Sequence, residues 1–289
     1  MHIALLTFEK HPELPASEAP LLAALERRGF TVRTAPWTSK RDWSAFDVAI
    51  PKLCWDYFER YEEFLSFLDH LDESGVTLVN PKKTITWNAD KKYLLDLSHQ
   101  GIDVAPFQLL EPENRANLQE SIQKWGYTDL VIKPTISAGS NETRRFVDQP
   151  EEAQKFAQSL ASHKVLMVQP FIPEIVEMGE ISLIYVGSQF SHGAIKKPKN
   201  GDFRSQPEFG SSITPYEPPP SIKSISDRLV QTLPHDQAYC RVDGYISQGK
   251  FRLMELELIE PYFYFEFGPE EAIEKCADAL AAMFHDRRN

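Results

Sequence analysis

The chain has 289 residues, of which 42% are hydrophobic and 25% charged, and its formal net charge is −11. This composition suits a globular protein of more than one domain or subdomain, and an acidic chain without a basic block is a poor partner for nucleic acid. Three widely separated cysteines, Cys54, Cys240 and Cys276, fit neither a disulfide framework nor a zinc site, so we expect a cytoplasmic protein. The first apolar run ends at Phe8, too short for a signal peptide, and no later run is long enough to span a membrane, so no membrane partner is expected.

Residues 1–87 alternate strand and helix patterns. Apolar strands are expected over residues 2–8, 31–34, 48–53 and 76–79. Amphipathic helices are expected over residues 17–29, with Ser17 as the N-cap, and over residues 58–73. This alternation predicts a small parallel α/β sheet, Rossmann-like in shape. The motif G-x-G-x-x-G does not follow the first strand, so a dinucleotide ligand is not expected.

The rest of the chain predicts an antiparallel sheet backed by helices. Helices are expected over residues 88–97, 113–125, 151–160, 221–232 and 269–284. Strands are expected over residues 129–134, 144–147, 165–171, 179–186, 189–195 and 238–247, and within 251–261.

Residues 251–261 carry the most informative pattern, because apolar and acidic side chains alternate there. Leu256 and Leu258 share one face of the predicted strand, and Glu255 and Glu257 share the other. Neighbouring carboxylates repel each other unless a cation lies between them, and carboxylates suit Mg²⁺, which takes its other ligands from water and phosphate. The pattern therefore predicts a strand whose acidic face binds a metal ion beside a nucleotide. An isolated Glu-x-Glu is more often the solvent-exposed face of a half-buried strand.

Asp243, in the preceding strand, joins these carboxylates only in some hairpin geometries. A two-residue turn at residues 248–249 places it opposite Met254, on the wrong face. A three-residue turn, or a bulge near Gly244, brings it to the face of Glu255. The metal hypothesis requires one of these two geometries.

Two further stretches suit a nucleotide. Lys133 ends a strand before the small-residue loop 135–141, where backbone N–H groups can approach phosphate, although an isolated match is more often a surface turn. The prolines around residues 169–173 end a buried strand and leave backbone groups for an adenine edge. Glu180 could bind ribose hydroxyls. A strand terminus and a surface acid are the ordinary alternatives for these last two features.

The only local basic cluster covers residues 196–204 and includes Lys196 and Arg204. It precedes Gly210 and Ser211, which open another small-residue loop. Anion binding is therefore one interpretation, and a solvated charged surface is the other.

Taken in order, these pieces resemble the ATP-grasp superfamily of carboxylate–amine ligases over residues 88–289. The resemblance implies that Lys91 and Lys133 bind phosphates and that Arg204 neutralises the transferred phosphoryl group. It also implies a phosphate-covering loop, an adenine hinge, a ribose ligand and metal ligands. The phosphate-covering loop corresponds to Ser137, Ala138, Gly139 and Ser140, and the adenine hinge corresponds to Gln169, Pro170, Phe171 and Ile172. The ribose ligand corresponds to Glu180, and the metal ligands correspond to Asp243, Glu255 and Glu257.

The chain is similar in particular to a subgroup that includes bacterial glutathione synthetase and the D-cycloserine-forming cyclo-ligase. The matching stretches are residues 55–57, 87–91, 137–139 and 254–261. Three positions depart from the usual pattern. Lys52 replaces an arginine common in the subgroup, Gly210-Ser211 replaces Gly-Gly, and Glu257 replaces an asparagine common in the superfamily. The substrate is therefore not inferred from the resemblance.

Lys52 and the following Trp55, Asp56 and Tyr57 are the candidates for holding a second substrate. They follow a strand end of the N-terminal sheet, where α/β sheets commonly bind ligands. Asp56 would attract an ammonium group and Lys52 a carboxylate. The alternative is that Trp55 and Tyr57 are core residues and Asp56 is a helix cap. Lys196, Arg204, Gly210 and Ser211 complete the predicted substrate-binding set.

The resemblance implies an α/β protein, α+β in its C-terminal part, with the ATP-grasp fold. A Rossmann-like pre-ATP-grasp domain is expected over residues 1–87 and the ATP-grasp region over 88–289, divided into a lid subdomain at about 115–187 and a metal-binding subdomain at about 188–289. The implied activity is ATP-dependent joining of a small acid to an amine with Mg²⁺ or Mn²⁺, in a protein that could be a homo-oligomer. Kinase-like phosphoryl transfer and non-catalytic ATP binding are the alternatives.

Overall fold

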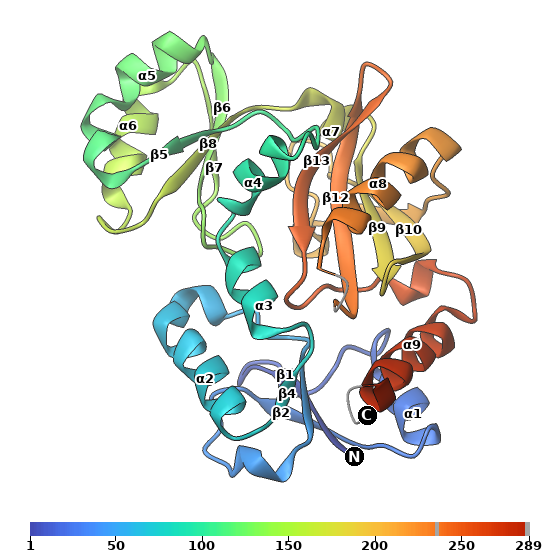
Figure 1. Cartoon of the computed structure of the whole chain (residues 1–289). Helices are drawn as coiled ribbons and strands as arrows, with labels where there is room; N and C mark the ends of the chain where they lie inside the picture. Colours follow the sequence, from blue (N-terminus) through green and yellow to red (C-terminus); the bar gives the residue numbers. More distant parts are fainter. Residues whose placement is uncertain (235–236, 287–289) are drawn as a thin grey trace.

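The computed structural model describes residues 1–234 and 237–286, and the strands described form three sheets (Figure 1). The first sheet is parallel, in the order β2-β1-β3-β4. Its strands are β1 (His2–Thr7), β2 (Thr31–Pro36), β3 (Val48–Pro51) and β4 (Thr77–Leu78). Helix α1 (Ala19–Arg27) packs on one face of the sheet and α2 (Tyr61–Glu73) on the other.

Both faces of this sheet are buried, and β1 shows why residues 3–6 form an unbroken apolar run. Ile3 and Leu5 pack into the cluster that contains α1, whereas Ala4 and Leu6 pack into the cluster that contains α2. Successive side chains of a strand point to opposite faces, so a strand covered on both sides needs a continuous apolar run. The predicted N-cap is wrong: α1 begins at Ala19, and the Ser17 hydroxyl is hydrogen-bonded to that of Tyr262.

The last helix, α9 (Ala272–Asp286), returns to the N-terminal sheet and lies beside α1 (Figure 1). The rings of Phe30 and Phe284 meet edge to face with their centroids 5.5 Å apart. Arg28 donates to Glu274 over 2.9 Å. The N-terminal layer therefore includes the C-terminal helix as well as residues 1–87.

The helix expected over residues 88–97 is two helices, α3 (Lys82–Ala89) and α4 (Tyr93–His99). Asp90 breaks the run because its backbone is extended, with φ −103° and ψ 117°. Its Oδ1 accepts a hydrogen bond from the Lys92 amide at 3.0 Å, which is the local side-chain bonding that competes with a continuous helix. Lys91 lies at this break, and its amide donates to the Thr135 carbonyl at 3.0 Å.

The second sheet is antiparallel, in the order β5-β8-β6-β7. Its strands are β5 (Gln108–Leu110), β6 (Asp129–Pro134), β7 (Arg144–Val147) and β8 (Leu166–Pro170). It packs against α5 (Leu118–Trp125) and α6 (Pro150–Ser159). The expected helix over residues 113–125 begins instead with a 3₁₀ segment, Pro112–Asn117.

The third sheet is also antiparallel, in the order β11-β10-β9-β12-β13. Its strands are β9 (Glu180–Val186), β10 (Gln189–Lys197), β11 (Ser212–Pro215), β12 (Tyr239–Ser247) and β13 (Lys250–Glu257). Helix α8 (Pro220–Thr232) packs on one face, and the short α7 (Pro173–Glu177) precedes β9. Because β9 pairs with β10 and β12, the second sheet ends with β8, before the lid boundary expected near residue 187.

The β12–β13 hairpin has the two-residue turn at residues 248–249, and both turn residues have positive φ. Of the two geometries that the metal hypothesis required, the three-residue turn is not formed and the bulge near Gly244 is. Asp243 pairs with Glu255 and Gly244 with Leu253, so Met254 is the extra residue. A Cβ at Gly244 would lie 2.4 Å from the Arg252 carbonyl oxygen, so only glycine fits there.

No helix within residues 1–234 and 237–286 is long and apolar enough to cross a membrane. Cys54, Cys240 and Cys276 are buried and free.

His192 in β10 joins the third sheet to the segment before α9. Its Nε2 lies 2.8 Å from the Phe263 carbonyl oxygen, and burial lowers the pKa of His192 below its ordinary 6.5. As the pH falls, His192 therefore takes up a proton in the unfolded chain before it does so in the folded protein. The free energy of unfolding should then fall as the pH is lowered from about 7.5 to about 5.5. We expect His192→Gln to lose part of this dependence in urea titrations at the two pH values. An unchanged pH dependence in the variant would contradict the assignment.

Candidate active site

A cavity of about 1000 Å³ lies between the second sheet, the third sheet and loops of the N-terminal layer. It brings together most of the predicted site residues from distant parts of the chain. Those that line it are Trp55, Tyr57, Lys91, Lys133, Ser137, Ala138, Gly139, Ser140, Gln169, Pro170, Phe171, Ile172, Glu180, Lys196, Arg204, Ser211, Asp243, Glu255 and Glu257. Lys52, Asp56 and Gly210 are not among its lining residues.

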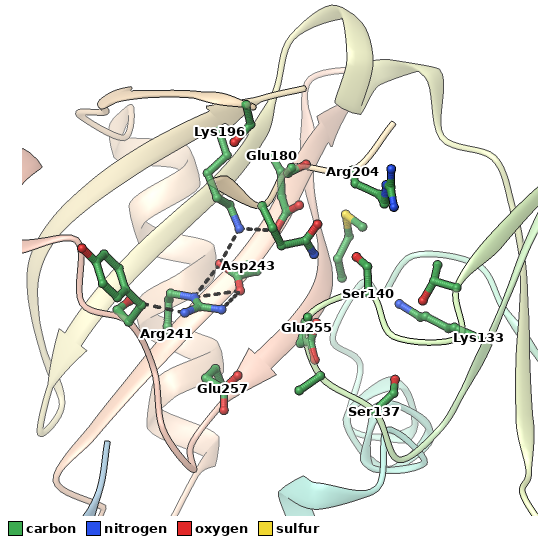
Figure 2. Close-up of a pocket in the computed structure, with 18 of the residues that line it drawn as sticks. Lys133, Ser137, Ser140, Glu180, Lys196, Arg204, Arg241, Asp243, Glu255 and Glu257 are labelled. Atoms are coloured by element: carbon green, nitrogen blue, oxygen red, sulfur yellow. Dashed lines mark hydrogen bonds and ion pairs between the residues drawn. The ribbon is translucent and has the colours of Figure 1, made fainter. Parts of the chain in front are cut away.

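Glu255 and Glu257 project from the same face of β13, as their spacing predicts (Figure 2). Lys91 Nζ lies 3.1 Å from Glu255 Oε1. Burial alone would raise the pKa of Glu255, but the ammonium groups of Lys91 and Lys133 outweigh burial and lower it. Burial raises the pKa of Glu257, although Arg241 opposes the shift. The two carboxylates therefore differ in how well the chain neutralises them.

Asp243 is 2% exposed, and the chain itself surrounds it with donors. The Arg241 guanidinium binds both carboxylate oxygens: Nε lies 3.1 Å from Oδ1 and 2.9 Å from Oδ2, and Nη2 lies 2.8 Å from Oδ2. The Ser182 hydroxyl donates to Oδ1, and Lys196 Nζ is 3.6 Å from it. Sequence reasoning missed Arg241. The signal was its spacing of two residues from Asp243, which puts both side chains on one face of β12.

Lys91 and Lys133 bring positive charge to the cavity from different elements. Lys91 Nζ donates to the Ser137 carbonyl at 2.6 Å and so joins the break between α3 and α4 to the loop after β6. The Lys133 ammonium makes no hydrogen bond or ion pair with another residue that the structure describes. Burial lowers the pKa of Lys133, and the neighbouring charge of Glu255 opposes this shift. An anion at Lys133 would relieve the cost of burying its charge.

The loop over residues 135–141 packs against the N-terminal layer. Ile136 and Ala138 touch the apolar cluster that contains α2, and the Ser137 hydroxyl donates to the Pro134 carbonyl at 3.1 Å. Gly139 and Ser140 both have left-handed backbone, with φ 58° and φ 57°. This conformation turns the chain sharply at the cavity wall, and glycine adopts it without steric cost.

The end of β8 forms an apolar slot with a polar edge. Val131, Ile172 and Met254 line it together with Phe171. The sequence suggested free backbone groups here, but the Phe171 amide donates to the Asp129 carbonyl at 2.8 Å. Gln169 is 5% exposed, and its Nε2 has no hydrogen-bond partner within the described residues. A flat apolar ring with an acceptor at its edge fits this slot.

Glu180 and Lys196 were predicted for separate roles, but the structure pairs them. Lys196 Nζ donates to Glu180 Oε1 on the neighbouring strand. Arg204 is held by Asp202, with Nε 3.0 Å from Oδ1 and Nη2 2.8 Å from Oδ2. In Figure 2, Lys133 and Arg204 lie to the right of Glu255, and Lys196 and Arg241 lie to its left. Cations thus flank the acidic residues on both sides.

Lys52 was predicted to bind a substrate carboxylate, but its ammonium is bound inside the protein. Lys52 Nζ pairs with Glu18 at 2.5 Å and donates to the Pro261 carbonyl at 2.8 Å. The two paired side chains are 0% and 1% exposed. The ammonium also lies 3.9 Å from the centre of the Phe263 ring. This arrangement ties the N-terminal layer to the segment before α9.

Asp56 was predicted to attract an ammonium group, but its Oδ1 accepts the indole N–H of Trp37 at 2.7 Å. It does not cap the following 3₁₀ segment. Gly210 has φ 81° and shapes the loop without reaching the cavity. Glu260 lines the cavity instead and was not predicted. Burial raises the pKa of Glu260 well above its ordinary value, and the charge of Glu257 adds to the shift.

A parallel sheet followed by two antiparallel sheets around a cavity of lysines and carboxylates is the ATP-grasp fold. The D-alanine–D-alanine ligase of Bacillus anthracis, solved as a complex with ATP, aligns with a TM-score of 0.73 at 15% identity, covering 100% of this chain and 99% of that one. An ATP-grasp RimK domain protein of Sphaerobacter thermophilus aligns with a TM-score of 0.70 at 16% identity, covering 98% and 99%.

Sequence similarity is greater to D-cycloserine synthetase DcsG. Residues 3–80 match the family described as the N-terminal domain of D-cycloserine synthetase DcsG. The cycloserine biosynthesis protein DcsG of Streptomyces lavendulae is 28% identical over 283 residues, covering 91% of this chain and 92% of that protein. The crystal structure of D-cycloserine synthetase DcsG aligns with a TM-score of 0.85 at 25% identity, covering 98% and 99%. The chain is an ATP-grasp enzyme of the carboxylate–amine ligase type, which forms carbon–nitrogen bonds in an ATP-dependent reaction.

Proposed function

We propose that the enzyme phosphorylates a substrate carboxylate, or a comparable acyl group, with ATP and then lets an amine displace the phosphate. The products are an amide, ADP and phosphate. The observation that carries the proposal is the position of Glu255, beside Lys91 and within the field of Lys133, at the centre of a cavity with cations on both sides. Preorganised charge of this kind stabilises a transferring phosphoryl group.

Each flank of the cavity has its own role in this proposal. Lys91 and Lys133, with the backbone of residues 137–140, hold the ATP phosphates, and Arg204 neutralises the transferred group. The slot beside Phe171 takes the adenine ring, whose acceptor nitrogen meets Gln169 Nε2. These roles are supported by the unpaired ammonium of Lys133 and the unpaired Gln169 amide within the described residues.

Mg²⁺, or Mn²⁺, would be held chiefly by Glu255 and Glu257. Their carboxylate oxygens are the donors that these hard cations prefer. No group of three His, Cys, Asp or Glu side chains within the described residues could hold a metal by itself. That observation fits an ion that takes its other ligands from phosphate and water. The ion would neutralise part of the phosphate charge. The predicted ligand Asp243 has its oxygens bound by Arg241 and Ser182, so its proposed part is to orient Arg241.

The opposite flank suits the carboxylate that is activated. Arg241 and Lys196 meet around Asp243, and Lys196 also pairs with Glu180. They would bind the substrate carboxylate and then the acyl oxygen as phosphate leaves. The similarity to DcsG supports an amino-acid-like substrate. Ser211 and Tyr264 complete this part of the cavity wall.

The test is a screen of D- and L-amino acids, including D-alanine and D-serine, for substrate-dependent ADP release with Mg–ATP. Hydroxylamine added with an accepted acid should trap the acyl phosphate as a hydroxamate. Lys133→Met should abolish both signals, because it removes the phosphate-binding ammonium and keeps a side chain of similar length. A stable phosphorylated product without a hydroxamate would identify a kinase. ADP release that no amino acid stimulates would also contradict the proposal.

A further inference from the structure

Glu260 is a cavity residue for which the site described so far has no role. It follows β13 and is 4% exposed. The Cys54 backbone amide favours its charged form and so acts to lower its pKa, but its Oε2 has no hydrogen-bond partner within the described residues. Burying a carboxylate oxygen without a donor costs free energy, and a ligand that brings the donor removes this cost.

The charges around Glu260 favour a positively charged ligand group. The charged groups that act on it most strongly, after its own burial, are Glu257 and Asp56, both acidic, with a smaller effect from Lys52. Lys52 is already bound to Glu18 and the Pro261 carbonyl. The cavity-lining cations that form ion pairs do so with other acids. A positively charged group of a ligand would therefore meet little competition at Glu260.

Aromatic side chains line the same cavity. Trp55 follows Cys54, whose backbone amide acts on the Glu260 carboxyl group, and it is 38% exposed. The His11 and Trp55 rings lie 6.2 Å apart by their centroids, and both residues line the cavity. Aromatic faces beside a carboxylate attract ammonium groups.

We propose that Glu260 binds the amine of the acceptor substrate, with its Oε2 accepting a hydrogen bond from the ammonium group and Trp55 covering the adjacent carbon. This inference rests on the ligase function proposed above and assigns the acceptor to a class: a small compound with a primary, cationic amine. Glu260 is a specificity-determining residue in this scheme. It takes the role that the sequence suggested for Asp56, which is instead bound to Trp37.

The test compares two probes that differ only in charge. D-alaninamide carries an ammonium group, and D-lactamide carries a neutral hydroxyl in its place. Their dissociation constants are measured by saturation-transfer NMR with Mg–ADP present, for wild type, Glu260→Gln and the control Glu271→Gln, whose exposed side chain pairs with Lys275 on α9. We expect wild type and the control to prefer D-alaninamide by about tenfold or more, and Glu260→Gln to lose this preference.

Thermal unfolding of Glu260→Gln checks the fold, and its Tm should match or exceed that of wild type, because a buried charge is removed. Equal binding of the two probes to wild type, no binding of either, or a preference that survives in Glu260→Gln overturns the inference. The ligase function is judged separately by hydroxamate formation in wild type. A positive hydroxamate signal with an unchanged probe preference would therefore reject the role of Glu260 alone.

Discussion

Replacing Glu255 with glutamine is expected to lower kcat/KM for ligation by at least about 100-fold while leaving the fold intact. The substitution keeps the size of the side chain and removes the charge that would hold Mg²⁺ and that pairs with Lys91 at 3.1 Å. The strand should survive because Leu253 and Leu256 anchor β13 in the core. The measurement is ADP release at saturating Mg–ATP, with circular dichroism and thermal unfolding to verify the structure.

Glu120→Gln is the matched control, since Glu120 is exposed on α5 and lies outside the cavity lining. It makes the same chemical change without touching the cavity, so it should retain wild-type kcat/KM. Near wild-type turnover in Glu255→Gln would show that Glu255 does not hold the metal. An equal loss in both variants would point to a general charge effect.

Replacing Lys52 with methionine is expected to destabilise the protein by about 3–5 kcal/mol. The change leaves the Glu18 carboxylate buried without its ion-pair partner, and it removes the contacts with the Pro261 carbonyl and the Phe263 ring. The Glu18 carboxylate still accepts the Phe263 amide, which does not replace a full positive charge. The free energy of unfolding is measured in urea for the variant and for wild type.

The double variant Lys52→Met/Glu18→Gln should recover part of the loss, because it no longer buries an unpaired charge. Below its unfolding temperature, Lys52→Met should keep the KM of wild type for both substrates. A small loss of stability together with a large rise in one KM would restore the substrate-binding role that the sequence suggested.

Features that depend on neighbours along the chain could be predicted from the sequence. The alternation of residues 251–261 placed Glu255 and Glu257 on one face of β13, because side-chain direction in a strand has a period of two residues. The small residues after Lys133 predicted a loop at the end of β6 for a similar reason, since glycine permits sharp turns at little steric cost. The alternating strands and helices of residues 1–87 predicted the parallel sheet.

Features that depend on distant partners were decided by the tertiary structure. The register of Asp243 required the bulge at Met254, which a turn sequence alone does not specify. Lys52 and Asp56 looked like ligand-binding residues until the fold brought Glu18 and Trp37 to them. A charged side chain binds whichever partner lies within a few ångströms, and for these residues that partner is not a sequence neighbour.

Glu260 is the opposite case, because folding leaves this charged side chain with an unpaired oxygen. In the sequence it is one more acid after Glu255 and Glu257, and nothing in its local pattern distinguishes it. Folding buries it against the Cys54 amide, far away along the chain, and leaves Oε2 without a donor at the cavity wall. The sequence alone determined the strand with its acidic face and the loop that follows Lys133. Only the tertiary structure decided which charges are already neutralised and which remain for a ligand, because burial and pairing arise from contacts between distant segments.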